Sequence, residues 1–256
     1  MPFDVQDLTL RLGDTTVLNG ISCRLPTRGI TGIIGENGCG KTTLLRCLAG
    51  VLRPASGRVQ HAGSDIAALS PKARARRIAM LPQSALAPAG LTVRQLVARG
   101  RTPWLRPFQP MSRADHAAVA RALSDVGLND LAARPLDSLS GGQRQRAWIA
   151  LVLAQDTDTV LLDEPLNFLD LPHQTELVHL LRRLATDRSV VMILHDLTIA
   201  ARICDHVLAL KAGRLVASGP PAEVLTAAPL RATFGIEFDC LSLPGSGKPV
   251  VLPQGL

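Results

Sequence analysis

The segment from Ile30 to Thr43, "ITGIIGENGCGKTT", restricts the possible folds more than any other part of the chain. Residues 35–42 fit the pattern GxxxxGK[ST], a glycine-rich loop whose backbone holds phosphate groups. Such a loop works only between a strand and a helix. Here the apolar "ITGIIG" precedes it and the helically spaced "KTTLLRCLAGVL", which we expect to stop at Arg53-Pro54, follows it. This context argues against a chance glycine-rich turn and predicts an α/β fold with a mostly parallel sheet.

The residues of this loop indicate how a nucleotide is held. Glycines let the loop curl so that backbone N–H groups point at phosphate oxygens, and the positive end of the following helix adds to the attraction. Lys41 is expected to reach the β and γ phosphates of ATP, and the Thr42 hydroxyl to bind Mg²⁺. We therefore expect the nucleotide to contact Gly35, Glu36, Asn37, Gly38, Cys39, Gly40, Lys41, Thr42 and Thr43.

A second strand pattern, "TVLLDEP", ends in two adjacent acids, Asp163 and Glu164. The carboxyl ends of parallel strands face one crevice, so these acids should lie on the same side as the phosphate loop. Asp163 is then the expected second protein ligand of Mg²⁺, and Glu164 the general base that activates water. Without the phosphate loop, this pair would be read as an ordinary solvated strand end.

Two further polar residues follow predicted strands. His195 comes after "VVMIL", and we expect it to contact the γ phosphate rather than to be a satisfied structural histidine. Gln83, in "MLPQ", is placed to reach the metal or the water. The predicted catalytic residues are therefore Lys41, Gln83, Glu164 and His195, and the predicted metal ligands are Thr42, Gln83 and Asp163.

The rest of the chain suggests where other parts attach to the sheet. The first thirty residues alternate as strands of an antiparallel β subdomain, whereas Leu91 to Ala154 read as helices. We predict one domain over residues 1–256, with a helical subdomain inserted at 84–157. "VLALKAGRLVASG" predicts a hairpin turned at Ala212-Gly213. The pattern after Pro229 leaves the tail undecided, except that "LPGSGKPVVLP" (243–253) is expected to be loop and edge strand.

Composition and charge limit which classes of function and cellular location remain possible. The net charge of +7 permits contact with nucleic acid or an anionic membrane face, but no aromatic residues interleave with the basic ones to stack bases. The longest uninterrupted apolar runs are too short to span a bilayer, and the N-terminus lacks a signal-peptide pattern. The cysteines contain no CxxC pair, so we expect neither disulfides nor a zinc site. We therefore also expect a reducing, cytoplasmic location. The five cysteines are Cys23, Cys39, Cys47, Cys204 and Cys240.

A second helix start suited to anions lies at 139–146, "LSGGQRQR". Ser140, Gly141 and Gly142 can offer a hydroxyl and backbone N–H groups at a helix N-terminus. One triphosphate is already held by the loop around Lys41, so this second start would serve another nucleotide. The alternative is a simple helix cap with tight packing.

These pieces, in this order, resemble the ATPase subunit of ATP-binding-cassette (ABC) transporters over nearly the whole chain. The resemblance depends on six motifs: the Walker A stretch at 35–43, the Q-loop at Gln83, the signature "LSGGQRQR", the Walker B stretch "TVLLDE", the D-loop "NFLD" and the switch histidine His195. The resemblance implies the P-loop ABC fold, ATP and Mg²⁺ as cofactors, and Glu164 as the catalytic base. It also implies that Gln83 couples the site to a membrane partner.

The resemblance further implies a two-fold dimer of the chain around two ATP. The signature residues of one copy, Ser140, Gly141, Gly142 and Gln143, would cap the ATP of the other, with Asp170 at the junction. ATP would close the dimer, and hydrolysis would release it.

More narrowly, the chain resembles importers of ferric siderophores, ferric dicitrate, haem and cobalamin, through stretches such as "RRIAMLPQ", "LTVRQLVARGRTPWL" and "EPLNFLDLPHQ". "GRTPW" before a helix is typical of the iron-siderophore branch. This implies a peripheral subunit on the cytoplasmic face of the inner membrane, which powers import of an iron chelate through a polytopic permease. A periplasmic or lipid-anchored binding protein would deliver the chelate, and no nucleic acid is expected as a partner. A haem or cobalamin importer is the alternative substrate class.

The chain departs from the family pattern at several positions. Leu12 stands where a tyrosine usually stacks on adenine, and Glu36 replaces a proline of the phosphate loop. Leu166 and Phe168 replace the usual threonine and histidine of the D-loop.

Two other functions compete with transport. A soluble ABC ATPase acting on DNA or ribosomes would carry long coiled coils or a second cassette, and a nucleotide sensor would not need Glu164.

Overall fold

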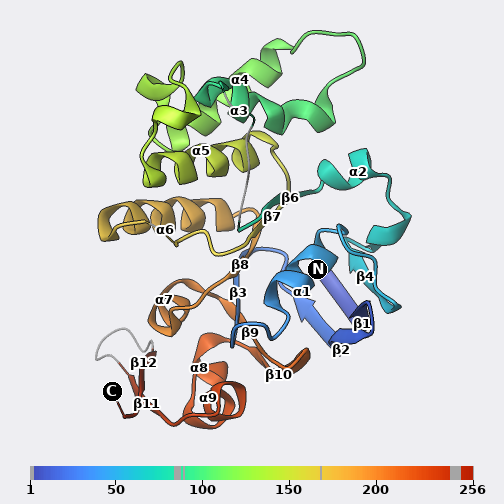
Figure 1. The fold of residues 1–256 in the computed structure, drawn as a ribbon, viewed down its shortest axis with the longest axis vertical. Coiled ribbons are helices and arrows are strands. Elements are labelled where there is room, and N and C mark those ends of the chain that lie inside the picture. Colours follow the sequence, from blue (N-terminus) through green and yellow to red (C-terminus); the bar gives the residue numbers. More distant parts are fainter. Residues whose placement is uncertain (1–2, 84–87, 89, 168, 243–248, 256) are drawn as a thin grey trace. The chain divides into compact units, whose positions relative to one another are not determined.

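The computed structural model describes residues 3–83, 88, 90–167, 169–242 and 249–255 (Figure 1). The chain divides into two compact units, one made of residues 1–69 and 185–256 and the other of residues 70–184. Every helix within the described ranges is too short or too polar to cross a membrane.

The first unit begins with the predicted antiparallel sheet. Its strands are β1 (Phe3–Leu12), β2 (Thr15–Leu25), β4 (Ser56–His61) and β5 (Ser64–Asp65), in the order β2-β1-β4-β5. The short helix η1 (Ile66–Ala68) follows. Apolar side chains alternate along β1, and Phe3, Val5, Leu8 and Leu10 are buried. The alternating pattern therefore predicted this sheet correctly.

The same unit contains a second group of strands, mostly parallel, that holds the phosphate loop. Strands β10 (Arg214–Gly219), β9 (His206–Lys211), β3 (Gly29–Gly35) and β8 (Ser189–Ile193) lie side by side in that order. β3 pairs in parallel with both β8 and β9. β9 and β10 form the predicted hairpin, with positive φ angles of 45° at Ala212 and 74° at Gly213.

One expectation for this unit needs correction. Helix α1 (Lys41–Leu48) does not continue to Arg53, because the chain turns at Gly50 with φ +66°. The edge strand expected within residues 243–253 is confirmed at 249–253, and the chain after β10 also has regular structure that the sequence left undecided. It contains α8 (Pro221–Val224), α9 (Ala227–Phe234) and a hairpin of β11 (Phe238–Ser242) and β12 (Pro249–Pro253), while α7 (Leu197–Ile203) follows β8.

The second unit carries two parallel strands and a group of helices. Strands β6 (Ile78–Leu81) and β7 (Thr159–Leu162) pair in register. In the described part of 91–154 the regular elements are all helical, as predicted, and α3, α4 and α5 pack against one another (Figure 1). The helices of this unit are α2 (Pro71–Ala75), α3 (Val93–Ala98), η2 (Arg99–Trp104), α4 (Arg113–Asp125), η3 (Asn129–Leu131), η4 (Leu136–Ser138), α5 (Gly141–Ala154) and α6 (Leu171–Ala185).

A buried ion pair ties these helices together. Arg101 Nε lies 2.9 Å from Asp115 Oδ1, and Arg101 Nη1 donates to the Ala154 carbonyl at the end of α5. Asp115 also closes a capping box with Ser112 at the start of α4. Hydrogen bonds from Ser112, and then the Arg101 guanidinium, lower the pKa of Asp115 from 3.8 to about 2. This carboxylate therefore stays ionised when the unit is folded.

Candidate functional site

The phosphate loop has the shape that its glycines predict. Gly35 ends β3 with φ +147°, and a Cβ built there would come 2.2 Å from the Leu210 carbonyl oxygen. Gly40 has φ +105° and precedes the first residue of α1, where it provides no side-chain cap. Only glycine tolerates this conformation and this close approach. The loop is held from behind by the hairpin turn, because Gly213 N donates to the Cys39 carbonyl at 3.0 Å.

Lys41 lies at the base of the loop and is only 6% exposed. Its Nζ donates to the carbonyls of Gly35 and Glu36, each at 2.8 Å. An ammonium has three donors, so one remains for a phosphate oxygen. Thr42 and Thr43 are half-buried in the first turn of α1, whereas Glu36, Asn37 and Gly38 are exposed. The loop thus combines a buried cation with an accessible rim.

His195 leaves the sheet at the same edge as the loop. β3 and β8 run in parallel and in register, and Leu194 N still donates to the Ile33 carbonyl at 3.1 Å. His195 follows and is exposed, and Asp196 caps α7 by accepting from the backbone N–H groups of Thr198 and Ile199. Leu12, at the end of β1, is 51% exposed and leaves its apolar side chain available for contact.

In the second unit, β6 and β7 bring Gln83 and the acidic pair to one edge. Asp163 N donates to the Leu81 carbonyl at 3.0 Å, which extends the pairing of the two strands by one residue. Asp163 itself is 1% exposed. A carboxylate this buried is costly to keep ionised unless a cation or hydrogen-bond donors compensate it. An oxygen ligand in such a place suits Mg²⁺.

The Thr42 hydroxyl and the Asp163 carboxylate are the oxygen donors that Mg²⁺ prefers. Within the described ranges, no group of three or more His, Cys, Asp and Glu residues could hold a metal ion. Nucleotide-bound Mg²⁺ keeps several waters and takes only one or two protein ligands, so it does not require such a group. Taken separately, each of the two oxygen donors is of the kind that this ion binds.

Glu164 is clamped by two side-chain amides. Gln83 Nε2 donates to Glu164 Oε2 at 2.8 Å, and Asn167 Nδ2 donates to the same oxygen at 2.5 Å. The backbone of Glu164 has φ +54°, a conformation that non-glycine residues rarely adopt and that is costly to hold. The structure thus joins Gln83 to Glu164, whereas the sequence placed Gln83 within reach of the metal or the water. Asn167 was missed by the sequence reasoning, although its place three residues after the acid was a usable signal.

The signature stretch forms the start of α5. Ser140 Oγ accepts from Gln143 N at 3.2 Å, and Gln143 Oε1 accepts from Ser140 N at 3.1 Å, which is a complete capping box. The helix cap that was the alternative interpretation is therefore present. It does not exclude anion binding, because a hydroxyl that accepts at the cap still has its own O–H to donate. Ser140 and Gly141 are exposed, and Gly142 and Gln143 are half-exposed.

Asp170 stands at the start of α6 and is exposed. Its Oδ1 accepts from the His173 backbone N–H and contacts His173 Nδ1. The hydrogen bond with the His173 side chain lowers the pKa of Asp170. Leu166 is buried, and Phe168 lies outside the described residues. Asp170 therefore also caps a helix, a role that the sequence did not suggest.

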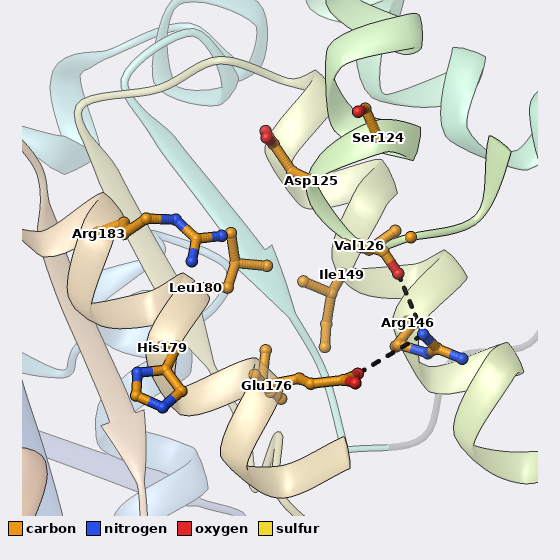
Figure 2. Close-up of a pocket in the computed structure, with 11 residues that line it drawn as sticks. Ser124, Asp125, Val126, Arg146, Ile149, Glu176, His179, Leu180 and Arg183 are labelled. Carbon is orange, nitrogen blue, oxygen red and sulfur yellow. Dashed lines mark hydrogen bonds and ion pairs between the residues drawn. The ribbon is translucent and has the colours of Figure 1, made fainter. Parts of the chain in front are cut away.

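A pocket of about 510 Å³ opens between α4, α5 and α6, and none of the residues that line it is a predicted site residue (Figure 2). At its edge Arg146 Nη1 donates to the Val126 carbonyl at 3.3 Å and lies 3.8 Å from Glu176 Oε2. Arg146 comes from the signature helix and Glu176 from the helix that follows Asp170. The pair therefore links these two helices.

Comparisons with known proteins give one consistent result. A family described as "ABC transporter" matches residues 18–167. The achromobactin transport ATP-binding protein CbrD of Dickeya dadantii is 44% identical over 98% of this chain and 94% of its own. The ferric enterobactin transport ATP-binding protein FepC of Escherichia coli is 43% identical over 98% and 93%. A metal-chelate type ABC transporter solved in an inward-facing conformation superposes with a TM-score of 0.85 at 28% identity, over 98% of this chain and 97% of that one.

Proposed function

The chain belongs to the ABC transporter family as an ATP-binding, ATP-hydrolysing subunit, and we propose that it powers import of a ferric chelate through a membrane permease. The observation that carries the substrate class is the 43–44% identity to the achromobactin and ferric enterobactin subunits over 98% of the chain. We further propose that residues 1–256 form one ATPase domain with a helical subdomain at 84–157. The protein would act at the cytoplasmic face of the inner membrane.

The proposed nucleotide site uses the two groups of residues already described. Lys41 binds β and γ phosphate oxygens from below, and the backbone N–H groups of 35–43 surround them. Leu12 gives the base an apolar contact. Thr42 and Asp163 would hold Mg²⁺, which supplies charge neutralisation at the phosphates when bound.

Hydrolysis is assigned to the acid after β7. Glu164 accepts a proton from the attacking water, and Gln83 and Asn167 hold its carboxylate in one orientation. Both amides donate to Oε2, so this is the oxygen that they hold in place. His195 would contact the γ phosphate. The side-chain amide of Gln83 also gives a route by which a permease contact near β6 could move the base.

The proposed conformational cycle, in which ATP closes a dimer and hydrolysis opens it, needs two copies of the chain. Ser140 and the N–H groups at the start of α5 would meet the γ phosphate held by the other copy, with Asp170 at the junction. Closure then depends on ATP, and opening follows its hydrolysis. A permease in the membrane and a substrate-binding protein outside it complete the proposed assembly.

Glu164→Gln tests the chemistry. The amide has nearly the same shape and keeps an oxygen that can accept from Gln83 and Asn167, but it cannot take a proton. We expect phosphate release to fall by about 100-fold to 10,000-fold while ATP binding is retained and the dimer persists. Asn167→Ala, which only loosens the base, should cost less. Equal phosphate release by wild type and Glu164→Gln would refute catalysis by this carboxylate.

Uptake assays test the substrate. The subunit, reconstituted with its permease and binding protein in vesicles, should import a ferric siderophore or ferric dicitrate in an ATP-dependent way. Import of haem or cobalamin alone would assign the alternative class, and the ATPase chemistry would stand in either case.

A further inference from the structure

The positive charge of the chain is concentrated in one segment. Residues 70–124 contain ten lysine and arginine residues but a single acidic residue, Asp115. The whole chain has 28 basic and 21 acidic residues, so the remainder is slightly acidic and the segment carries all of the net positive charge. Such segregation indicates a surface for an anionic partner rather than a generally solvated protein.

The one acid in the segment does not neutralise this surface. Asp115 is buried and paired with Arg101, which is also buried. Lys72, Arg76, Arg106 and Arg113 are exposed, and among the described residues none of them forms an ion pair with an acidic side chain. Their charges are therefore presented to solvent.

The loop that carries Arg106 is fastened in place. Lys72 Nζ donates to the Leu105 carbonyl at 2.7 Å, and Arg76 Nε donates to the Pro103 carbonyl at 2.9 Å. The guanidinium of Arg76 also stacks on the Trp104 ring, 5.1 Å from its centre. Helix α2 and the end of η2 thus form one basic support beneath the loop, which is the green arch that leads into α4 in Figure 1.

Phe108 forms the tip of this loop. Its side chain is 105% exposed, whereas the other exposed large hydrophobic side chains of the described residues range from 37% to 77%. Its backbone has φ +60°, an unfavourable conformation for an aromatic residue. Two prolines, Pro107 and Pro110, stiffen the chain on either side. The ring therefore projects from a rigid turn with cations at its base.

We propose that this basic loop surface, made of Lys72, Arg76, Arg106, Phe108 and Arg113, contacts anionic lipid headgroups of the membrane. Cations near an acidic leaflet are attracted to it, and a projecting ring among cations can enter the boundary between headgroups and acyl chains. One occupant thus satisfies both the charge and the apolar tip. The inference goes beyond ATP hydrolysis and substrate, and takes from the proposed function only the nearby membrane.

Other anionic partners fit less well. An acidic protein surface would match the charge, but it would need a pocket shaped for the Phe108 ring. Single-stranded nucleic acid is bound by rows of aromatic rings on which bases stack. Here the Trp104 ring is covered by Arg76 and Arg101, so Phe108 is left alone.

Vesicle sedimentation tests the proposal. The whole purified protein is mixed with phosphatidylcholine vesicles that do or do not contain phosphatidylglycerol. We expect binding only to the acidic vesicles, weakened by salt. An arginine near the surface is worth about 1 kcal/mol, or about fivefold, so Arg106→Gln with Arg113→Gln should weaken binding about 30-fold. Phe108→Ser should weaken it about fivefold or more.

The matched control is Arg28→Gln with Arg53→Gln, two exposed arginines of the first unit, which changes the net charge equally and should leave binding intact. Thermal unfolding and ATP binding of each variant verify that it is folded. Glu164→Gln should bind vesicles like wild type, so a failure of the catalytic proposal remains separate.

Four results would overturn the inference. Three of them are no preference for acidic vesicles, equal weakening by the control pair, and attachment only to vesicles that hold the permease. The fourth is duplex DNA binding as tight as vesicle binding, with neither changed by Phe108→Ser, which would assign the surface to polyanions in general.

Discussion

Ser140 is predicted to have two separable roles, one within its own chain and one toward the partner's nucleotide. Within the chain it caps α5 through Gln143. Ser140→Ala removes the cap, so we expect a loss of about 1 kcal/mol of unfolding free energy, or about 2–4 °C in Tm for a chain of this size. Aspartate caps a helix as well as serine does and favours the positive end of the helix, so Ser140→Asp should leave Tm unchanged or slightly raised.

The same two variants should differ in the opposite sense when ATP is present. If Ser140 meets the γ phosphate of the other copy, the carboxylate introduced by Ser140→Asp would lie within about 4 Å of another anion, a repulsion of roughly 4 kcal/mol at an effective dielectric constant of about 20. ATP-dependent dimerisation should then weaken by about 100-fold or more. Ser140→Ala loses only one hydrogen bond and should weaken it less than about tenfold.

Size-exclusion chromatography with light scattering measures the dimer, best in a Glu164→Gln background that retains ATP, and circular dichroism measures Tm. Thr92 provides the control, because it caps α3 through Gln95 with the same kind of capping box. Thr92→Asp should change neither quantity by much. Two results together would refute the proposed ATP-dependent dimer: Ser140→Asp dimerises with ATP like wild type, and it hydrolyses ATP equally well where Glu164 is intact. The start of α5 would then not face a phosphate.

Three further outcomes are expected. Gly35→Ala would place a Cβ 2.2 Å from the Leu210 carbonyl and should abolish ATP binding in an equilibrium titration; normal affinity would contradict the close-approach argument. Leu12→Tyr adds an aromatic ring at a half-exposed position and should tighten ATP binding about fivefold or more, as measured by fluorescence titration; no gain would mean that adenine does not lie there. The folded pKa of Asp115, about 2, lies below its ordinary value of 3.8, so its stabilisation is complete above about pH 4 and is lost as pH falls toward 2. Asp115→Asn should remove that acid dependence and cost about 3–5 kcal/mol at neutral pH, because Arg101 is left buried and unpaired; denaturant unfolding across this pH range measures both.

Local patterns predicted most elements of the fold. Strand β3, the phosphate loop and the start of α1 follow from one short stretch, because glycine geometry and helix-start chemistry are local properties. The end of α1 was misplaced, since helical spacing continues past Leu48 and only the left-handed turn at Gly50 stops it. The sequence predicted the edge strand that forms β12 but not its partner β11, because residues 238–242 have little alternation of their own.

The sequence by itself determined the chemical groups of the site: a phosphate-binding loop, an acidic pair after a buried strand and a capped helix start at Ser140. These motifs also indicated the family. What only the tertiary structure decided is how distant groups constrain one another. Gln83 and Asn167 hold one oxygen of Glu164, and the ammonium of Lys41 is held by loop carbonyls. The physical reason is range: a turn or a cap depends on neighbours a few residues away, whereas Gln83 reaches Glu164 only because β6 and β7 pair in register across about eighty residues of intervening chain.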